Sequence, residues 1–338
     1  MKALVCIKPG FLEYTEIPEP PLKAGHAIVR IRNIGICGTD LHAYEGTQPF
    51  FDYPRILGHE LSGELMDFDD APGFERGEAV TFLPYLHCGD CIACRVGKTN
   101  CCVHLQVCGV HIDGGMADYY SIPSSLLVHS NGLDLADLAL VEPMAIGAHG
   151  IRRADVQPGE FVLVMGAGPI GLATMEFAKL KGANIIAMDV NSRRLEFCKN
   201  VLGISNIIHA GNTDVTEQLS DITQGNMPTV VIDASGNQKA IHSGLNYLAH
   251  GGRYILTGLQ KDEIMFSHPA FHKKETTLMS SRNATRVDFE YVIQNIVNRK
   301  ISPRSFITNR VKFKDAAAGF PDWTDPSNHV IKVIVEKE

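Results

Sequence analysis

The sequence has no block of lysine and arginine residues, no internal repeat, no low-complexity segment and no apolar run long enough to cross a bilayer. It contains 31 Lys and Arg residues against 38 Asp and Glu residues, a formal net charge of −7. This balance opposes a broad basic surface, so neither nucleic acid nor an anionic membrane is an expected partner. The residues after Met1 run into an alternating strand pattern without the features of a signal peptide. We therefore predict a cytoplasmic protein with reduced thiols.

The length of 338 residues exceeds the size at which one hydrophobic core stops growing, so two domains are expected. Residues 1–140 contain short strand patterns interrupted by Gly and Pro, which is typical of a mainly β domain. Further on, apolar strands alternate with helical segments, which indicates a parallel sheet with crossover helices. The elements predicted there are strands at 161–165, 185–189, 229–233 and 253–257 and a helix at 172–181. A helix at 289–297 and a strand at 330–335 break this pattern, so we expect the tail to return partly to the β domain.

Four of the nine cysteines are closely spaced, as Cys88-x2-Cys91-x2-Cys94-x7-Cys102. Four thiolates at such spacings can bind one soft cation tetrahedrally, and we predict a closed structural zinc site. The odd number of cysteines disfavours a disulfide framework. An iron–sulfur cluster is the stronger alternative, because one ferredoxin motif also begins C-x2-C-x2-C, but that motif continues x3-C-P.

A glycine-rich loop follows an apolar strand and precedes the predicted helix: Gly166-Ala167-Gly168-Pro169-Ile170-Gly171. In such a loop Gly166 permits the turn, Gly168 lets a pyrophosphate approach the backbone, and Gly171 allows the helix to pack closely. The free N–H groups at the helix N-terminus can then bind phosphate. The context of strand, loop and helix predicts a dinucleotide site.

An acidic residue follows this loop at the expected distance. Asp189 ends the next predicted strand, where its carboxylate can accept hydrogen bonds from the adenosine ribose. Because it would repel a 2′-phosphate, NAD is predicted over NADP. Arg193 and Arg194 lie close by in sequence and soften that preference, and Arg194 is counted among the predicted cofactor-binding residues.

A second set of potential metal ligands lies outside the cysteine motif. It comprises Cys37 with the nearby Thr39, Asp40 and His42, the tripeptide Gly58-His59-Glu60, and Glu142. Thiolate, imidazole and carboxylate together suit a catalytic zinc, where three protein ligands leave a position for water or substrate. Taken singly, each is more readily explained as a buried core residue than as a metal ligand, and only the combination favours a metal site. Thr39 and His42 are a suitable hydroxyl and imidazole for proton transfer, and we expect Asp40 to orient His59.

Taken in order, Gly58-His59-Glu60, the four-cysteine motif and the glycine-rich loop resemble the zinc-dependent medium-chain alcohol dehydrogenases, over essentially the whole chain. The resemblance implies an α/β protein of two domains. A GroES-like β catalytic domain at 1–148 would carry both zinc ions, and a Rossmann domain with a doubly wound parallel sheet at 149–282 would bind NAD. The tail at 283–338 would return to the catalytic domain. A homodimer or homotetramer joined through the Rossmann sheet is also implied.

The same resemblance implies roles for individual residues. Glu142 stands where ethanol-active members have a third cysteine ligand, which places the chain in the polyol and sugar branch similar to sorbitol dehydrogenase. In that branch Cys37, His59 and Glu60 would bind the catalytic zinc, with Glu142 binding through water or exchanging with Glu60. The substrate proton would pass through Thr39 and the nicotinamide ribose to His42 and solvent.

Segments at 46–51, 272–277 and 281–285 resemble sugar-acid dehydrogenases, which oxidise a secondary alcohol to a ketone. Arg282 is the main candidate for binding a substrate carboxylate, because its planar fork can donate two hydrogen bonds, and His111 and Gln48 are weaker candidates. A neutral polyol such as sorbitol or galactitol, or L-threonine, is an alternative substrate. A non-catalytic zinc protein that binds NAD is an alternative of another class, which the intact proton-transfer residues disfavour.

Overall fold

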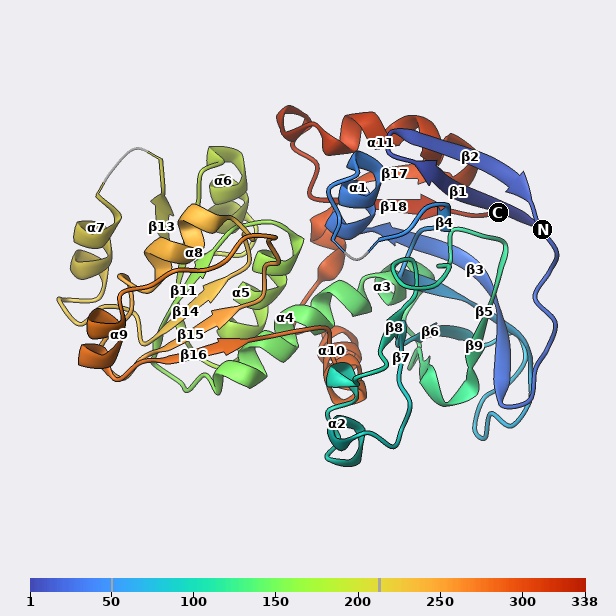
Figure 1. Ribbon diagram of the computed structural model, residues 1–338, viewed down its shortest axis with the longest axis horizontal. Helices are drawn as coiled ribbons and strands as arrows, with labels where there is room; N and C mark the ends of the chain where they lie inside the picture. The colour runs from blue at the N-terminus through green and yellow to red at the C-terminus, as the bar shows by residue number, and fades with distance from the viewer. Residues whose placement is uncertain (50, 212–213) are drawn as a thin grey trace. The chain divides into compact units, whose positions relative to one another are not determined.

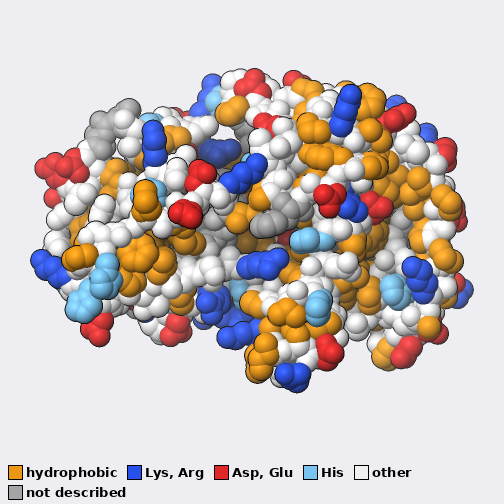
Figure 2. Space-filling model, in the orientation of Figure 1, with side chains coloured by type: hydrophobic (Ala, Val, Ile, Leu, Met, Phe, Trp, Pro, Cys, Tyr) orange, Lys and Arg blue, Asp and Glu red, His pale blue; other side chains and the backbone are white. Residues whose placement is uncertain are grey.

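The computed structural model describes residues 1–49, 51–211 and 214–338, so Phe50 of the 46–51 segment lies outside the described residues. The chain forms two compact units, Met1–Pro143 with Ala284–Glu338 and Met144–Asn283. Both acidic and basic side chains occur across the face drawn in Figure 2. Within the described ranges, no helix combines the length and apolarity needed to cross a membrane.

The first unit is built mainly from antiparallel strands (Figure 1). A seven-stranded sheet has the order β10-β6-β5-β3-β18-β17, with β9 also paired to β3, beside a sheet of order β2-β1-β4 and the pair β7-β8. The bounds are β1 Lys2–Lys8, β2 Phe11–Glu16, β3 His26–Ile36, β4 Arg55–Ile56, β5 Glu60–Phe68, β6 Ala79–Phe82, β7 Tyr85–Leu86, β8 Gln106–Val107, β9 Tyr119–Pro123, β10 Leu127–His129, β17 Ile307–Lys312 and β18 Lys332–Glu336.

The tail contributes directly to this sheet. Strand β18 pairs antiparallel with β3, so that Ile334 lies opposite Gly35, and β3 pairs on its other side with β5, so that Gly35 lies opposite Glu60. Three segments far apart in sequence therefore lie side by side around residue 35.

Helices of this unit are α1 Gly38–Glu45, α2 Ile92–Arg95, α3 Leu135–Ala139, α10 Arg286–Val297 and α11 Ala316–Thr324, with short 3-10 helices η1 Thr99–Cys101, η2 Ser124–Leu126, η3 Pro303–Phe306, η4 Phe313–Asp315 and η5 Pro326–Asn328. Helix α4 (Val141–Ala154) contains the boundary between the units.

The second unit is a parallel sheet with the order β13-β12-β11-β14-β15-β16 (Figure 1). This order, in which the chain reverses direction beside the first strand, is that of a doubly wound dinucleotide-binding sheet. Its strands are β11 Phe161–Met165, β12 Asn184–Asp189, β13 Asn206–His209, β14 Val230–Asp233, β15 Arg253–Leu256 and β16 Thr277–Ser280. Its other helices are α5 Pro169–Leu180, α6 Ser192–Asn200, α7 Val215–Ile222, α8 Gln238–Gly244 and α9 His268–Lys274.

The predicted strands of this unit agree closely with β11, β12, β14 and β15, and the predicted helix 172–181 with α5. Strands β13 and β16, at the two edges of the sheet, were missed by the sequence pattern. The central strands contain buried apolar residues such as Leu163, Ile186 and Val231. Because strands of a parallel sheet are covered on both faces, their sequences are continuously apolar, which made them predictable.

Candidate zinc and nucleotide sites

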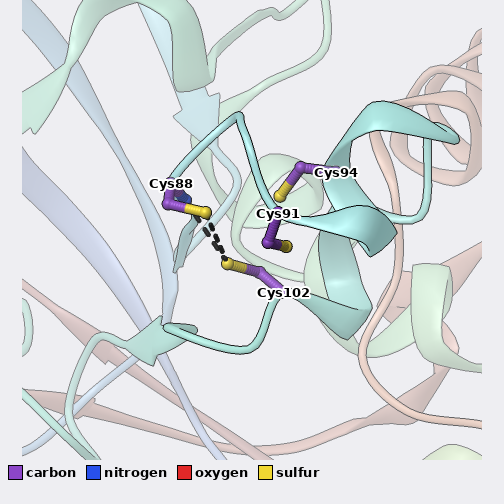
Figure 3. A group of neighbouring side chains, drawn as sticks. All are labelled: Cys88, Cys91, Cys94 and Cys102. Atoms are coloured by element: carbon purple, nitrogen blue, oxygen red, sulfur yellow. Dashed lines mark hydrogen bonds between the residues drawn. The ribbon is translucent and has the colours of Figure 1, made fainter.

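The four cysteines of the 88–102 motif lie together in the first unit (Figure 3). Their sulfur atoms lie within 4.8 Å of one another. Cys94 is carried by α2, Cys91 immediately precedes that helix, and Cys102 follows η1. The backbone N–H groups of Cys88 and His104 both donate to Cys102 Sγ at 3.3 Å. The loop backbone therefore points its donors at sulfur, as a thiolate site requires.

Two of the four thiols have a lowered pKa, as a metal ligand requires. Backbone N–H donors lower the pKa of Cys91 to about 6, and the N–H of Cys88 is the main cause that lowers the pKa of Cys102. These two residues favour the thiolate form that binds zinc. The hydrogen bond with Asp90 is the main cause that raises the pKa of Cys88 to about 12, and burial is the main cause that raises the pKa of Cys94, so these two thiols would lose their protons when the metal binds. Four sulfur ligands within this distance fit a closed tetrahedral site, in which zinc would have a structural role. Cys101, next to Cys102, is exposed and does not belong to the group.

A second group in the same unit consists of Cys37, His59 and Glu60, with ligand atoms within 4.8 Å of one another. Cys37 precedes α1, and Glu60 begins β5. His59 and Glu60 are 5% and 0% exposed, and His59 Nδ1 has no hydrogen-bond partner although it is buried. Cys37 is half-buried, and the combination of thiol, imidazole and carboxylate fits a catalytic zinc with an open position.

Asp40 fixes this group through the backbone. It accepts hydrogen bonds from the N–H of Cys37 at 2.9 Å and of Gly58 at 3.0 Å, so one carboxylate connects the segments that carry Cys37 and His59. Asp40 Oδ1 and His59 Nδ1 are 4.0 Å apart, which is too far for a hydrogen bond, so the orientation of His59 by Asp40 stays a prediction. Asp40 is fully buried, and burial is the main cause that raises its pKa.

The surroundings of His59 are strongly anionic. Burial alone would lower the pKa of this imidazole, but Cys37, Asp40 and Glu142 together raise it well above its usual range. Such a field favours a cation at this point, which is a further property expected of a metal site.

Glu142 lies near this group but is held separately. It lies outside the set of residues whose ligand atoms are within 4.8 Å, and its carboxylate accepts a hydrogen bond from the buried Tyr85 hydroxyl. Burial is the main cause that raises the pKa of Glu142, to about 7, and burial together with Glu142 raises the pKa of Tyr85 well above its usual range. Tyr85 was not found from the sequence, because no motif connects it with a residue 57 positions away.

Lys332 is the other residue that sequence reasoning missed. It lies in β18, is 2% exposed, and donates to both carboxylate oxygens of Glu60 at 2.7 and 2.8 Å. An unexpected lysine in the apolar strand pattern at 330–335 was the one available signal, since a fully buried lysine requires a partner.

Thr39 and His42 lie three residues apart on α1. Thr39 Oγ1 is 3.6 Å from Cys37 Sγ and half-buried, whereas His42 is exposed. Thr39 therefore lies at Cys37 and His42 at solvent, which is the order that a proton exit needs.

The glycine-rich loop connects β11 with α5 in the second unit. Gly166 has φ 99°, and a Cβ on Gly171 would lie 1.8 Å from Gly166 O, so neither position tolerates a side chain. Gly168 is the N-cap of α5 and Pro169 its first residue, followed by Ile170. The loop thus leaves the first N–H groups of α5 to a ligand, as a phosphate site requires.

Asp189 lies at the carboxyl end of β12 and is 8% exposed. Its Oδ2 accepts from Ala167 N–H at 2.6 Å and its Oδ1 from Asn191 N–H at 2.8 Å, so it also fastens the glycine-rich loop. Each carboxylate oxygen keeps a further lone pair for a ribose hydroxyl. Arg194 Nη1 lies 3.7 Å from where a Cβ on Gly168 would be, which places this guanidinium beside the loop.

The three substrate candidates lie in different parts of the chain. Arg282 is exposed, two residues beyond the end of β16 in the second unit. In the first unit, Gln48 is half-buried after α1, and His111 Nδ1 accepts from Val107 N–H at 3.0 Å. Their roles remain a proposal.

Comparison with known proteins matches both units. The family models "Alcohol dehydrogenase GroES-like domain" and "Zinc-binding dehydrogenase" match residues 23–132 and 169–298. L-galactonate-5-dehydrogenase of Escherichia coli (strain K12) is 40% identical over 336 residues, which is 99% of this chain and 98% of that protein. This chain belongs to the zinc-binding alcohol dehydrogenases. Probable D-xylulose reductase A of Emericella nidulans is 32% identical over 322 residues, which cover 92% of this chain and 90% of that protein.

A solved structure supports the fold of this alcohol dehydrogenase. A short chain alcohol dehydrogenase from E. coli CFT073, complexed with NADH, has a TM-score of 0.92 at 30% identity and covers 99% of both chains. The predicted combination of a GroES-like domain with a Rossmann-type parallel sheet is therefore confirmed, as are membership of the zinc-dependent enzyme family and the resemblance to a sugar-acid dehydrogenase.

Proposed function

We propose that this alcohol dehydrogenase oxidises a secondary hydroxyl of a sugar acid to a ketone and transfers the hydride to NAD. The observation that carries the proposal is the group of Cys37, His59 and Glu60, with Glu142 near it rather than a further cysteine. The similarity along nearly the whole length to an L-galactonate-5-dehydrogenase supports a sugar acid as the substrate class.

Cys37, His59 and Glu60 would hold the catalytic zinc, with Glu142 as a water-mediated or exchanging ligand. When bound, zinc supplies a Lewis acid that favours loss of the proton from the substrate hydroxyl. Thr39, beside Cys37, would accept that proton at its hydroxyl while passing its own proton on, and the exposed His42 would release a proton to solvent. Oxidation of the alcohol carbon thus yields one ketone, one hydride and one proton.

Residues of the second unit would bind the coenzyme. Gly166, Gly168 and Gly171 leave room for the pyrophosphate at α5, and Pro169 and Ile170 begin that helix. Asp189 would accept hydrogen bonds from the adenosine ribose and disfavour a 2′-phosphate, with Arg194 beside the phosphate loop. NAD also supplies the hydride acceptor.

We propose further that the enzyme is a homo-oligomer, a dimer or tetramer, joined through the parallel sheet. Strand β16 lies at the edge of that sheet, and exposed edges are normally paired or covered. We propose domain limits of 1–148, 149–282 and 283–338. We also propose a cytoplasmic location, because both zinc sites need reduced thiolates.

We expect NADH absorbance at 340 nm to rise when the zinc-loaded protein is mixed with NAD and L-galactonate. The panel should include other aldonates, sorbitol, galactitol, xylitol and L-threonine, because pockets select a hydroxyl by the groups around it. The proposal is supported if kcat/KM for an aldonate is at least about tenfold higher than kcat/KM for each neutral polyol. A preference for L-threonine, or no turnover of any alcohol, contradicts it.

A neutral polyol is the second candidate. The similarity to a probable D-xylulose reductase, whose name indicates an uncharged ketose, favours it. If kcat/KM in that panel is highest for xylitol or sorbitol, the substrate is a neutral polyol and not a sugar acid.

Replacement of Arg282 by lysine tests recognition of the carboxylate. Arg282 follows the carboxyl end of β16, the edge of a parallel sheet at which ligands bind. Lysine keeps the charge but loses the planar fork, so we expect kcat/KM for L-galactonate to fall about tenfold and that for sorbitol to change less than twofold. The control is Arg76→Lys, a surface residue paired with Asp67. Equal losses on both substrates would reject this role.

A further inference from the structure

Two buried hydroxyl groups lie at the carboxyl edge of the parallel sheet. Thr257 is the first residue beyond β15, and Ser281 is the first beyond β16. Thr257 Oγ1 and Ser281 Oγ are both buried, and neither has a hydrogen-bond partner in the part of the chain that the structure describes. Ser281 as a whole is 7% exposed. A buried hydroxyl without a partner is costly, so such groups are normally satisfied by protein atoms or by an ordered water molecule.

The strands that carry these hydroxyls are neighbours, and α4 lies against their ends. Strand β15 pairs parallel with β16 so that Leu256 lies opposite Ser280. One residue further on, the N–H of Ser281 donates to the carbonyl oxygen of Leu256 at 2.8 Å. From α4, Arg153 donates to the carbonyl oxygen of Ser280 through Nε and Nη2, at 3.4 Å each. The helix is therefore attached to the same end of β16.

A glycine of α4 faces both hydroxyls. Apart from its chain neighbours and the helix backbone, a Cβ on Gly150 would have two atoms of the described chain within 4 Å, Thr257 Oγ1 at 3.6 Å and Ser281 Oγ at 3.8 Å. These are ordinary contact distances, so steric exclusion does not require glycine here. At Gly147 it does, because a Cβ there would lie 2.6 Å from the backbone nitrogen of Thr174. Glycine at 150 therefore leaves a space that two hydroxyls border.

We propose that Gly150, Thr257 and Ser281 form a buried binding site for one water molecule, which holds the ends of β15 and β16 against α4. Water suits the site because it is small and can donate to or accept from each hydroxyl. An ion does not, because two hydroxyls offer it no opposite charge. Ligands of such a sheet bind at the carboxyl ends of its strands, so the water also positions the edge that receives NAD. This last effect rests on the coenzyme site of the proposed function.

Crystal structures of the enzyme with and without NADH test the site directly. We expect one water oxygen within about 3.2 Å of both hydroxyl oxygens in both crystals. A direct hydrogen bond between Thr257 and Ser281, an empty space, or a coenzyme atom in the place of the water would overturn the inference.

Two substitutions of Gly150 separate the water from helix propensity. In Gly150→Ala a methyl group displaces the water and leaves both hydroxyls unpaired, whereas in Gly150→Ser a new hydroxyl takes the place of the water. We expect the thermal midpoint of Gly150→Ser to exceed that of Gly150→Ala by about 3 °C, although alanine is the better helix former. Gln294→Ala and Gln294→Ser, at an exposed position of α10, are the matched controls, and there alanine should give the higher midpoint. A higher midpoint for alanine at position 150 as well would overturn the water site.

Removal of both hydroxyls should reverse the effect of alanine. In Thr257→Val with Ser281→Ala, no side-chain hydroxyl remains to bind the water. Adding Gly150→Ala to that double variant should raise the thermal midpoint by about 2 °C, because helix propensity alone then acts. The same effect of Gly150→Ala with and without the two hydroxyls would contradict a shared site.

NADH affinity, measured by fluorescence, reports the positioning effect. We expect the Kd of NADH to rise about three- to tenfold in Gly150→Ala and to return to within about twofold of the unmodified enzyme in Gly150→Ser. An unchanged Kd in Gly150→Ala would overturn the positioning role. Failure of the unmodified enzyme to bind NADH would instead overturn the coenzyme site of the proposed function, which the midpoint measurements do not involve.

Discussion

Replacement of Cys37 by serine is expected to lower kcat/KM for the preferred alcohol roughly a thousandfold or more, because the catalytic metal loses its thiolate ligand. The Lewis-acid effect of a bound metal is worth several kcal/mol in the transition state, and each 1.4 kcal/mol is about tenfold in rate. Serine keeps the size of the side chain but is a poor zinc ligand at neutral pH. Elemental analysis should show a loss of about one zinc ion per chain.

NAD binding distinguishes this loss from general damage. The glycine-rich loop and Asp189 belong to the other unit, so NADH affinity measured by fluorescence should change less than about twofold. Cys198→Ala is the matched control, because Cys198 is a buried cysteine whose thiol has its pKa raised by burial to about 12 and lies outside both metal groups. It should retain metal and activity. Full metal content and turnover in Cys37→Ser would refute the assignment of this site.

Local sequence motifs were sufficient for the parts of the site that lie close together in the chain. The four cysteines fall within fifteen residues, and the glycine-rich loop lies between β11 and α5, so spacing alone predicts their geometry. The central strands could be predicted equally well, because strands buried on both faces have uninterrupted apolar sequences. Edge strands β13 and β16 have only four residues each and were missed.

Contacts between distant strands could not be predicted in this way. Lys332 and Glu60 are 272 residues apart, and they meet only because β18 pairs with β3 in a register that places Gly35 between them. The hydrogen bond from Tyr85 to Glu142 likewise depends on tertiary packing. A sequence pattern can identify each of these residues as unusual, but the sheet register decides which of them touch.

The adjacent cysteines Cys101 and Cys102 offer a sharp test of the structural zinc site. Cys102 is 3% exposed and belongs to the four-cysteine group, whereas Cys101 is exposed and does not. We expect Cys102→Ser to lose about one zinc ion per chain and to lower the thermal midpoint by roughly 10 °C, because metal binding contributes directly to folding of such a loop. Cys101→Ser should match the unmodified enzyme in both measurements.

A chelator should distinguish the two metals in the unmodified enzyme. The group of Cys37, His59 and Glu60 leaves a position open to an incoming ligand, whereas four sulfurs complete the coordination of the other ion. We therefore expect activity to be lost first, with the thermal midpoint little changed, and the 88–102 loop to become sensitive to protease only after the second zinc is removed. In Cys102→Ser that protease sensitivity should be present from the start. Simultaneous loss of both metals, or one metal per chain, would contradict two sites of different kinds.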